Sequence, residues 1–241
     1  MRILVTNDDG INASELPRLI SYFKRFGEVT AVVPKFEQSG KSQGIEIHKP
    51  FEAKKTYLVP DVTVWAVDST PADCVRFAVL GLKLKFDLVV SGINRGLNIG
   101  TDVMYSGTVG AAFEANLLGI KSVAISTSPE YYDRAMLHLD SVREFFVKNA
   151  LFDKNNAYNV NIPEDPKEIL ITRQGGPYYS DDFVPIGNDM YMPHGKSIWC
   201  DRNDNSLDTD ATLHGYISVT PLTICTTEMN VYNSLTSKGK E

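Results

Sequence analysis

From the N-terminus to about residue 165, short apolar runs alternate with helix-like patterns, and this alternation limits the fold more than any other feature. The runs that read as buried strands are residues 3–6, 29–34, 62–67, 86–94, 122–126 and 159–163. Parallel strands need a crossover between them, and that crossover is usually a helix packed on the sheet. The pattern therefore predicts an α/β fold with a parallel sheet and helices on both faces.

Four of the intervening segments have helical spacing. They are residues 16–26, which stop at Gly27, the segment that opens at Thr70, residues 107–119, and residues 131–149, which read as one long amphipathic helix. Thr70 is a suitable N-cap, Pro71 suits the first helical position, and Asp73 suits the positive start of a helix.

After about residue 165 the alternation breaks down. Residues 173–215 are rich in Gly, Pro, Tyr, Asp and Asn and have weak periodicity, so we expect hairpins and long loops there. Residues 215–224 alternate well enough to form a returning strand. The sequence thus predicts one domain, with residues 1–165 as the α/β core and residues 166–241 as a C-terminal appendage.

Composition excludes several classes of partner. The chain of 241 residues carries a net charge of −6 without a Lys/Arg cluster, which argues against nucleic acid. No apolar run is long enough to span a membrane, and the N-terminus lacks a secretory signal pattern. Three widely spaced cysteines argue against disulfides and zinc. We therefore expect a cytoplasmic protein with neither a membrane nor a nucleic acid as partner.

Three polar segments follow predicted strands, at residues 7–10, 35–44 and 91–108. Ligands of doubly wound sheets bind beyond the carboxyl ends of the strands, so the fold would bring these segments together. By itself, the first of them, Asn-Asp-Asp-Gly, could equally be a solvated turn.

Common nucleotide and phosphatase motifs do not fit these segments. Residues 35–42 would match a phosphate-binding P-loop, except that Lys35 stands where Gly is required. Glycines 92, 96 and 100 recur every fourth residue, which is not the dinucleotide-binding spacing. Asn7 stands two positions before Asp9, so an Asp-x-Asp phosphatase mechanism is disfavoured.

The remaining polar groups suit a hard divalent cation. Asp8 and Asp9 offer carboxylates, Ser39 a hydroxyl and Asn94 a side-chain carbonyl, which are ligands for Mg²⁺ or Mn²⁺ rather than zinc. A cation would turn the repulsion between Asp8 and Asp9 into shared attraction. Next to this set, a predicted helix starts at Gly107 between the hydroxyls of Ser106 and Thr108, which is a ready site for an anion such as phosphate.

At this point the chain resembles the survival protein E (SurE) family of metal-dependent nucleoside-monophosphate phosphatases. The motifs that carry the resemblance run in order along nearly the whole chain: ILVTNDDG, QSGKS, TPADCV, DLVVSGINRGLNIG, YSGTVGAAFEA, NVNIP, DTDA and GYISVTPL. The resemblance implies a Rossmann-like fold whose C-terminal elements are exchanged between subunits of a homodimer or homotetramer.

The resemblance also implies roles for residues. It assigns one divalent ion per subunit to Asp8, Asp9, Ser39 and Asn94. We expect Asp8 or Asp9 to act also as the catalytic base for the attacking water. It assigns phosphate binding to Gly40, Asn98, Ser106, Gly107 and Thr108. The implied activity is hydrolysis of nucleoside monophosphates. The position of the phosphate, 5′ or 3′, stays open, and so do short polyphosphates and sugar phosphates as substrates. The alternative is a nucleotide-binding stress sensor without catalysis.

Several other residues carry weaker expectations. Ser69 replaces the family's usual Gly, so a positive φ there would be strained, although Ser69 could instead share capping with Thr70. Cys74 is expected in the core and His138 in a structural role. His194 of the appendage is a candidate for contact with substrate, whereas Trp199 and the tyrosines could stack on a base or, in preference, pack against another subunit.

Overall fold

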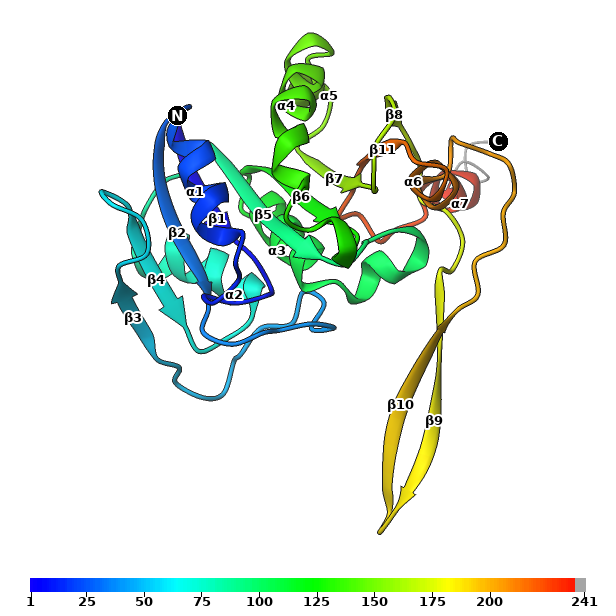
Figure 1. Cartoon of the computed structure of the whole chain (residues 1–241), viewed down its shortest axis with the longest axis horizontal. Coiled ribbons are helices and arrows are strands. Elements are labelled where there is room, and N and C mark those ends of the chain that lie inside the picture. The colour runs from blue at the N-terminus through cyan, green and yellow to red at the C-terminus, as the bar shows by residue number, and fades with distance from the viewer. Residues whose placement is uncertain (237–241) are drawn as a thin grey trace.

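The structure, a computed structural model, describes residues 1–236 and is built around a nine-stranded sheet (Figure 1). The order of the strands is β3-β4-β2-β1-β5-β6-β7-β11-β8. Their bounds are β1 (Arg2–Thr6), β2 (Glu28–Pro34), β3 (Ala53–Thr56), β4 (Thr63–Val67), β5 (Leu88–Arg95), β6 (Lys121–Thr127), β7 (Ala157–Ile162), β8 (Ile169–Ile171) and β11 (Ile217–Pro221). The predicted α/β fold is confirmed.

Six consecutive strands, from β4 to β7 across the sheet, are parallel. The sheet is mixed only at its margins, where β3 pairs antiparallel with β4 and β11 pairs antiparallel with β7. Since parallel strands share their direction, the carboxyl ends of β1, β2 and β5 open on the same edge. The three polar segments follow these ends.

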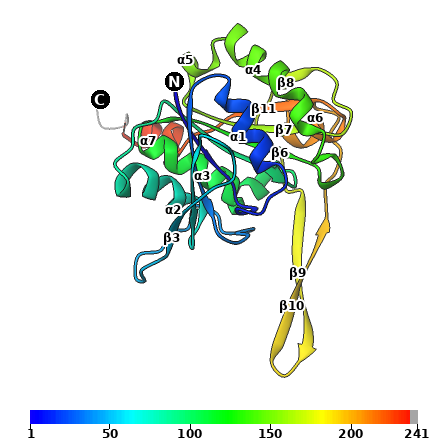
Figure 2. The same ribbon diagram turned by 60° about the vertical axis from the view of Figure 1, so that its left-hand side comes forward.

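Helices cover both faces of the sheet (Figures 1 and 2). The α-helices of the body are α1 (Leu16–Lys24), α2 (Pro71–Arg76), α3 (Gly107–Leu117), α4 (Leu139–Lys148), α5 (Leu151–Lys154) and α6 (Asp208–Leu213). Shorter helical turns are η1 (Phe77–Gly81), η2 (Gly100–Tyr105), η3 (Pro129–Tyr131) and η4 (Ala135–His138).

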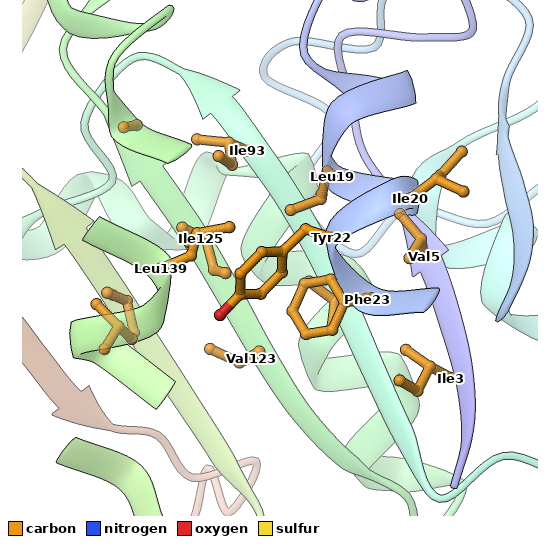
Figure 3. Packing of buried hydrophobic residues seen from close by; sticks show 14 of the residues in the cluster. Ile3, Val5, Leu19, Ile20, Tyr22, Phe23, Ile93, Val123, Ile125 and Leu139 are labelled. Carbon is orange, nitrogen blue, oxygen red and sulfur yellow. The ribbon is translucent and has the colours of Figure 1, made fainter. Parts of the chain in front are cut away.

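The alternation of side chains along β1 divides the core into two layers. Ile3 and Val5 belong to the cluster that includes α1 and α4, whereas Leu4 belongs to the cluster with α2 and α3. Figure 3 shows the first layer, in which Tyr22 and Phe23 of α1 lie between β1 and Leu139 of α4. Ile3, Leu4 and Val5 are all fully buried, so the alternation of their side chains between the two layers fixes the register of β1.

The C-terminal third contributes both to the sheet and to a separate hairpin. Strands β8 and β11 follow residue 165 and yet join the nine-stranded sheet. Strands β9 (Tyr179–Gly187) and β10 (Met190–Ser197) form an antiparallel hairpin that extends away from the body in both views (Figures 1 and 2). The last described helix is α7 (Met229–Thr236).

The long helix predicted for residues 131–149 is wrong in its first half. Short 3₁₀ helices cover residues 129–131 and 135–138 with a turn between them, and only α4 is regular. Tyr132, Leu139 and Val142 nevertheless pack in the same core cluster, so apolar residues are buried on either side of the break.

Candidate functional site

The Asn-Asp-Asp-Gly turn after β1 is closed by its own first side chain. Asn7 Nδ2 donates to the Gly10 carbonyl at 3.0 Å, and the Gly10 amide donates to Asn7 Oδ1 at 3.2 Å. Gly10 has a φ of +84°, a conformation that a side chain would strain. Asn7 and Gly10 thus hold the turn, and Asp8 and Asp9 are left for other partners.

Asp8 is tied to the start of α3. Thr108 Oγ1 donates to Asp8 Oδ1 at 2.5 Å, and the Thr108 amide donates to Oδ2 at 3.2 Å. Only 4% of Asp8 is exposed, and burial raises its pKa to about 6. The hydrogen bond from Thr108 opposes that rise, and the neighbouring charge of Asp9 adds to it. A positive charge nearby would stabilise the ionised form of such a buried carboxylate.

Asp9 is bonded to the last residue of β5. The Arg95 amide donates to Asp9 Oδ2 at 3.2 Å. Burial raises the pKa of Asp9, the Arg95 amide lowers it, and the charge of Glu37 raises it further. Among residues 1–236, neither Asp8 nor Asp9 forms a salt bridge.

The side chain of Asn94 is oriented by the loop that follows β5. Its Nδ2 donates to the Gly96 carbonyl at 2.7 Å. Because the amide nitrogen is used in this bond, the side-chain oxygen is the atom left to accept a ligand. Asn94 immediately precedes the residue that binds Asp9, so its side-chain oxygen belongs to the end of β5 that contacts Asp9.

The second loop joins the site through its backbone. The Gln38 amide donates to the Asp8 carbonyl at 2.8 Å. Farther along, Ser42 Oγ donates to the Met104 carbonyl at 2.6 Å, just before α3. Ser39 and Gly40 lie between these two anchors and are exposed, and Ser39 Oγ donates to Glu37 Oε1 at 2.7 Å.

The start of α3 leaves one amide for a ligand. Ser106 is the N-cap, and its Oγ accepts from the Val109 amide at 3.1 Å. The Thr108 amide donates to Asp8, so within the described residues only the Gly107 amide of the first three has no partner. A Cβ on Gly107 would lie 3.1 Å from Asp8 Cβ, which shows how closely the helix approaches the acidic turn.

Asn98 is not exposed at the site but lies buried behind it. It is buried, and its Nδ2 donates to Ser126 Oγ at 2.8 Å. Its amide donates to Asn161 Oδ1 at 2.8 Å, and its carbonyl accepts from Asn159 at 2.7 Å. Sequence reasoning missed these two asparagines, although polar residues at alternate positions of a buried strand are a signal for such a network.

A second buried carboxylate, that of Asp208, binds the segment after β5. Its Oδ1 accepts from the Gly100 amide at 3.1 Å and from the Gly175 amide at 2.7 Å. Burial raises the pKa of Asp208, and these backbone amides oppose the rise. Asp208 therefore fixes the loop after β5 to the segment that leads into the hairpin.

The secondary candidates fall outside this cluster. Thr70 caps α2 as predicted, whereas Ser69 has no positive φ and donates to Asp73 Oδ2 at 2.6 Å. Cys74 is buried in the core. His194 lies on β10 of the hairpin.

The last two secondary candidates are His138 and Trp199. His138 stacks on Tyr131, with 6.0 Å between the ring centroids. Trp199 donates to Asp210 Oδ1 at 3.0 Å and so is used in packing the C-terminal third.

Within residues 1–236, no group of three or more His, Cys, Asp and Glu side chains is arranged so that it could hold a metal ion. The predicted ligand set contains only two such residues, and its other members are Ser39 and Asn94. No described helix has the length and apolar character that crossing a membrane requires.

Comparison with known proteins identifies the family. The family model described as survival protein SurE matches residues 3–181. A protein named 5′-nucleotidase SurE from Thermoanaerobacter sp. (strain X514) is 38% identical, with 98% of each chain covered. One of the same name from Thermosipho melanesiensis is 39% identical over 93% of this chain and 92% of its own. The crystal structure of the Sure protein from Aquifex aeolicus, 33% identical, superposes with a TM-score of 0.79 over 99% of both chains. The chain belongs to the survival protein SurE family.

Proposed function

We propose that this protein is a divalent-metal-dependent phosphatase that hydrolyses nucleoside monophosphates to nucleoside and phosphate. The observation that carries the proposal is the buried Asp8 carboxylate, which accepts from the start of α3 and interacts with the neighbouring charge of Asp9. The relatives named 5′-nucleotidase cover almost the whole chain and favour the 5′ position of the phosphate.

The donor atoms of the site fit one hard divalent cation per subunit, Mg²⁺ or Mn²⁺. Asp8 and Asp9 supply two carboxylates whose burial disfavours their charged form. Asn94 supplies a neutral oxygen that its bond to Gly96 leaves free. Ser39 would complete the set, with a hydroxyl that now donates to Glu37. Oxygen donors of these types are the ones that Mg²⁺ and Mn²⁺ prefer.

When bound, such an ion supplies positive charge that polarises the phosphoryl oxygens and lowers the pKa of a nearby water molecule. Asp8 or Asp9 accepts the proton of the attacking water. Thr108 keeps Asp8 in place through two hydrogen bonds. The Gly107 amide and the Ser106 hydroxyl donate to the phosphoryl oxygens as charge develops on them. Gly40, next to Ser39 on the second loop, lies beside the bound phosphate. Asn98 supports the site from its buried side through its bond to Ser126.

The hairpin supports a further proposal about assembly. We propose a homodimer or homotetramer in which the C-terminal elements contact another subunit. Seven large apolar side chains of the hairpin are at least 47% exposed, which is an unusual surface for an isolated chain: Tyr179, Phe183, Val184, Ile186, Met190, Tyr191 and Met192. Cys74, Cys200 and Cys225 are all free thiols, which suits the reducing cytoplasm that we propose as its location.

The test is phosphate release from a panel of phosphomonoesters in chelator, in Mg²⁺ and in Mn²⁺. We expect release from nucleoside 5′-monophosphates that disappears in chelator and returns with either metal. Full activity after metal removal would contradict the metal mechanism. No release with any metal would favour the sensor without catalysis.

A further inference from the structure

Two carboxylates outside the candidate site, Asp73 of α2 and Glu114 of α3, are buried. Only 3% of Asp73 and 4% of Glu114 is exposed, and the proposed mechanism uses neither. Burying a carboxylate costs much free energy unless charged or hydrogen-bonding partners compensate it. The partners of these two carboxylates therefore show which parts of the chain they hold.

Glu114 joins α3 both to α2 and to the second loop. Its Oε1 accepts from Arg76 Nη1 at 3.1 Å, and its Oε2 accepts from Gln43 Nε2 at 2.9 Å. Gln43 follows Ser39 by four positions on the second loop. Each oxygen of the buried carboxylate thus has a partner, one from a helix and one from the loop that carries a predicted metal ligand.

The start of α2 holds the residues that follow Gln43. Thr70 Oγ1 donates to the Gly44 carbonyl at 2.7 Å, and the Glu46 amide donates to Asp73 Oδ2 at 2.8 Å. The same Oδ2 accepts from the Ser69 hydroxyl at 2.6 Å. Positions 43, 44 and 46 are therefore each bound to α3 or to the start of α2 through a side chain.

The second loop is thus anchored on both sides of a short exposed stretch. On one side the Gln38 amide donates to the Asp8 carbonyl at 2.8 Å. On the other side residues 42–46 bind the segment before α3, α3 itself and the start of α2. Residues 39–41 lie between these anchors and are exposed, so their position depends on the anchors.

We propose that Glu114 is a positioning residue, which through Gln43 sets the place of Ser39 and Gly40 relative to the start of α3. This inference rests on the proposed function, in which Ser39 binds the cation and Gly40 lies beside the phosphate. Glu114 follows Thr108 by six residues on the same helix, about 9 Å along its axis. One rigid helix therefore carries both the start that binds Asp8 and the carboxylate that holds the loop of Ser39.

The variant Gln43→Met tests the bond between the loop and Glu114. Methionine keeps the length of the side chain but has no N–H or O–H donor, while the pair of Arg76 and Glu114 stays in place. Gln43→Lys is the matched control, because its ammonium can donate to the same oxygen. Asp73, Arg76 and Glu114 carry two negative charges and one positive charge, so an added cation is attracted there.

The first measurement is hydrogen exchange of the backbone amides in chelator, followed by mass spectrometry over residues 37–46. We expect exchange in Gln43→Met to be about tenfold faster than in the parent, because a hydrogen bond to a charged group is lost. Gln43→Lys should exchange nearly as the parent does. The melting temperature in chelator should stay close to the parent's in both variants, since Gln43 is only half-buried.

The second measurement is calorimetric binding of Mn²⁺ without substrate. We expect Gln43→Met to lower the affinity about tenfold, as the loss of a group that orients a metal ligand does. Gln43→Lys should restore most of this affinity. A role in stability alone would instead lower the melting temperature of Gln43→Met and leave the Mn²⁺ affinity of the folded protein unchanged.

Unchanged exchange or unchanged Mn²⁺ affinity in Gln43→Met would each overturn the inference, and so would an equal loss in Gln43→Lys. A parent that neither binds Mn²⁺ nor releases phosphate from AMP would contradict the proposed function on its own account. The binding of inorganic phosphate then decides the inference, since the same anchors place Gly40. Weaker binding to Gln43→Met than to the parent would support it, whereas equal binding, or none to the parent, would overturn it.

Discussion

Thr108 has two contacts with one carboxylate, and at the scale of single residues this pair decides the geometry of the site. Its hydroxyl and its amide both donate to Asp8. We expect Thr108→Val to lower the affinity for Mn²⁺ without substrate by about tenfold to a hundredfold, because a hydrogen bond to a charged group contributes roughly 1.5–3 kcal/mol. Thr108→Ser keeps the hydroxyl and should bind Mn²⁺ nearly as the parent does. Calorimetry checks this, and unchanged affinity in Thr108→Val would show that Asp8 is held by other means.

Asp9→Asn should abolish activity and yet leave the metal-free protein at least as stable as the parent. The charges of Asp8 and Asp9 repel each other, and Glu37 adds to the repulsion at Asp9. An amide at position 9 removes this repulsion and keeps an oxygen for the Arg95 amide. Since a ligand of the native state raises stability by mass action, Mn²⁺ should raise the melting temperature of the parent and hardly affect the variant.

Thermal melts of both proteins, each in chelator and in millimolar Mn²⁺, check this expectation. A variant that melts well below the parent in chelator would show that the Asp9 carboxylate holds the turn together. The pair would then be a structural turn rather than a cation site.

The sequence could indicate Asp8, Asp9 and Asn94 because the order of strands alone brings the ends of β1 and β5 together. It could not indicate the bond between Asp8 and Thr108, which depends on how closely α3 approaches the first loop across 100 positions of sequence. Asn98 shows the same limit, since its place beneath the site depends on contacts with Ser126 and Asn161 of neighbouring strands. The roles of these residues in binding stay predictions.

At the scale of elements, the contact between α3 and the loop of Ser39 depends on one glycine. A Cβ on Gly110 would lie 2.2 Å from the Ser42 carbonyl oxygen. Gly110→Ala would gain about 1 kcal/mol in helix propensity, but the overpacking costs roughly 1–3 kcal/mol and forces the loop outward. We therefore expect a lower melting temperature and faster tryptic cleavage after Lys35 and Lys41.

Leu117→Ala is the matched control for this expectation, because Leu117 is 56% exposed at the end of the same helix. It should cleave at the rate of the parent. If Gly110→Ala also melts and cleaves like the parent, the loop is not held by its close approach to α3.

The central strands could be predicted to within about two residues because burial on both faces makes their apolar runs continuous. The edge strands β3 and β8 could not, since they are short and contain no fully buried residue, and so lack such a signal. The break between residues 131 and 139 escaped prediction for a different reason. Its helical spacing is real, and Tyr132 and Leu139 are both buried in one core cluster, so the pattern of apolar residues does not reveal the break.

At the scale of the whole molecule, the hairpin is the feature that a single chain does not explain. The composition of residues 173–215 predicted hairpins, but not two long strands that extend from the body with apolar side chains exposed (Figure 1). Within residues 1–236, strands β9 and β10 pair only with each other, and almost all of their residues are exposed. A stable interface between subunits buries about 1,200–2,000 Å² in total, and an extended hairpin offers surface for it.

We expect light scattering after size-exclusion chromatography to show a homodimer or homotetramer, and the variant Phe183→Ser/Ile186→Ser/Tyr191→Ser to shift toward smaller species. Each of these side chains is more than half exposed, so their loss should cost the folded chain little while it removes apolar area from the interface. The control Ile47→Ser/Tyr57→Ser/Leu137→Ser removes side chains at least 71% exposed elsewhere on the body and should keep the parent's mass. A monomeric parent, or a hairpin variant with unchanged mass, would show that the exposed hairpin has another use.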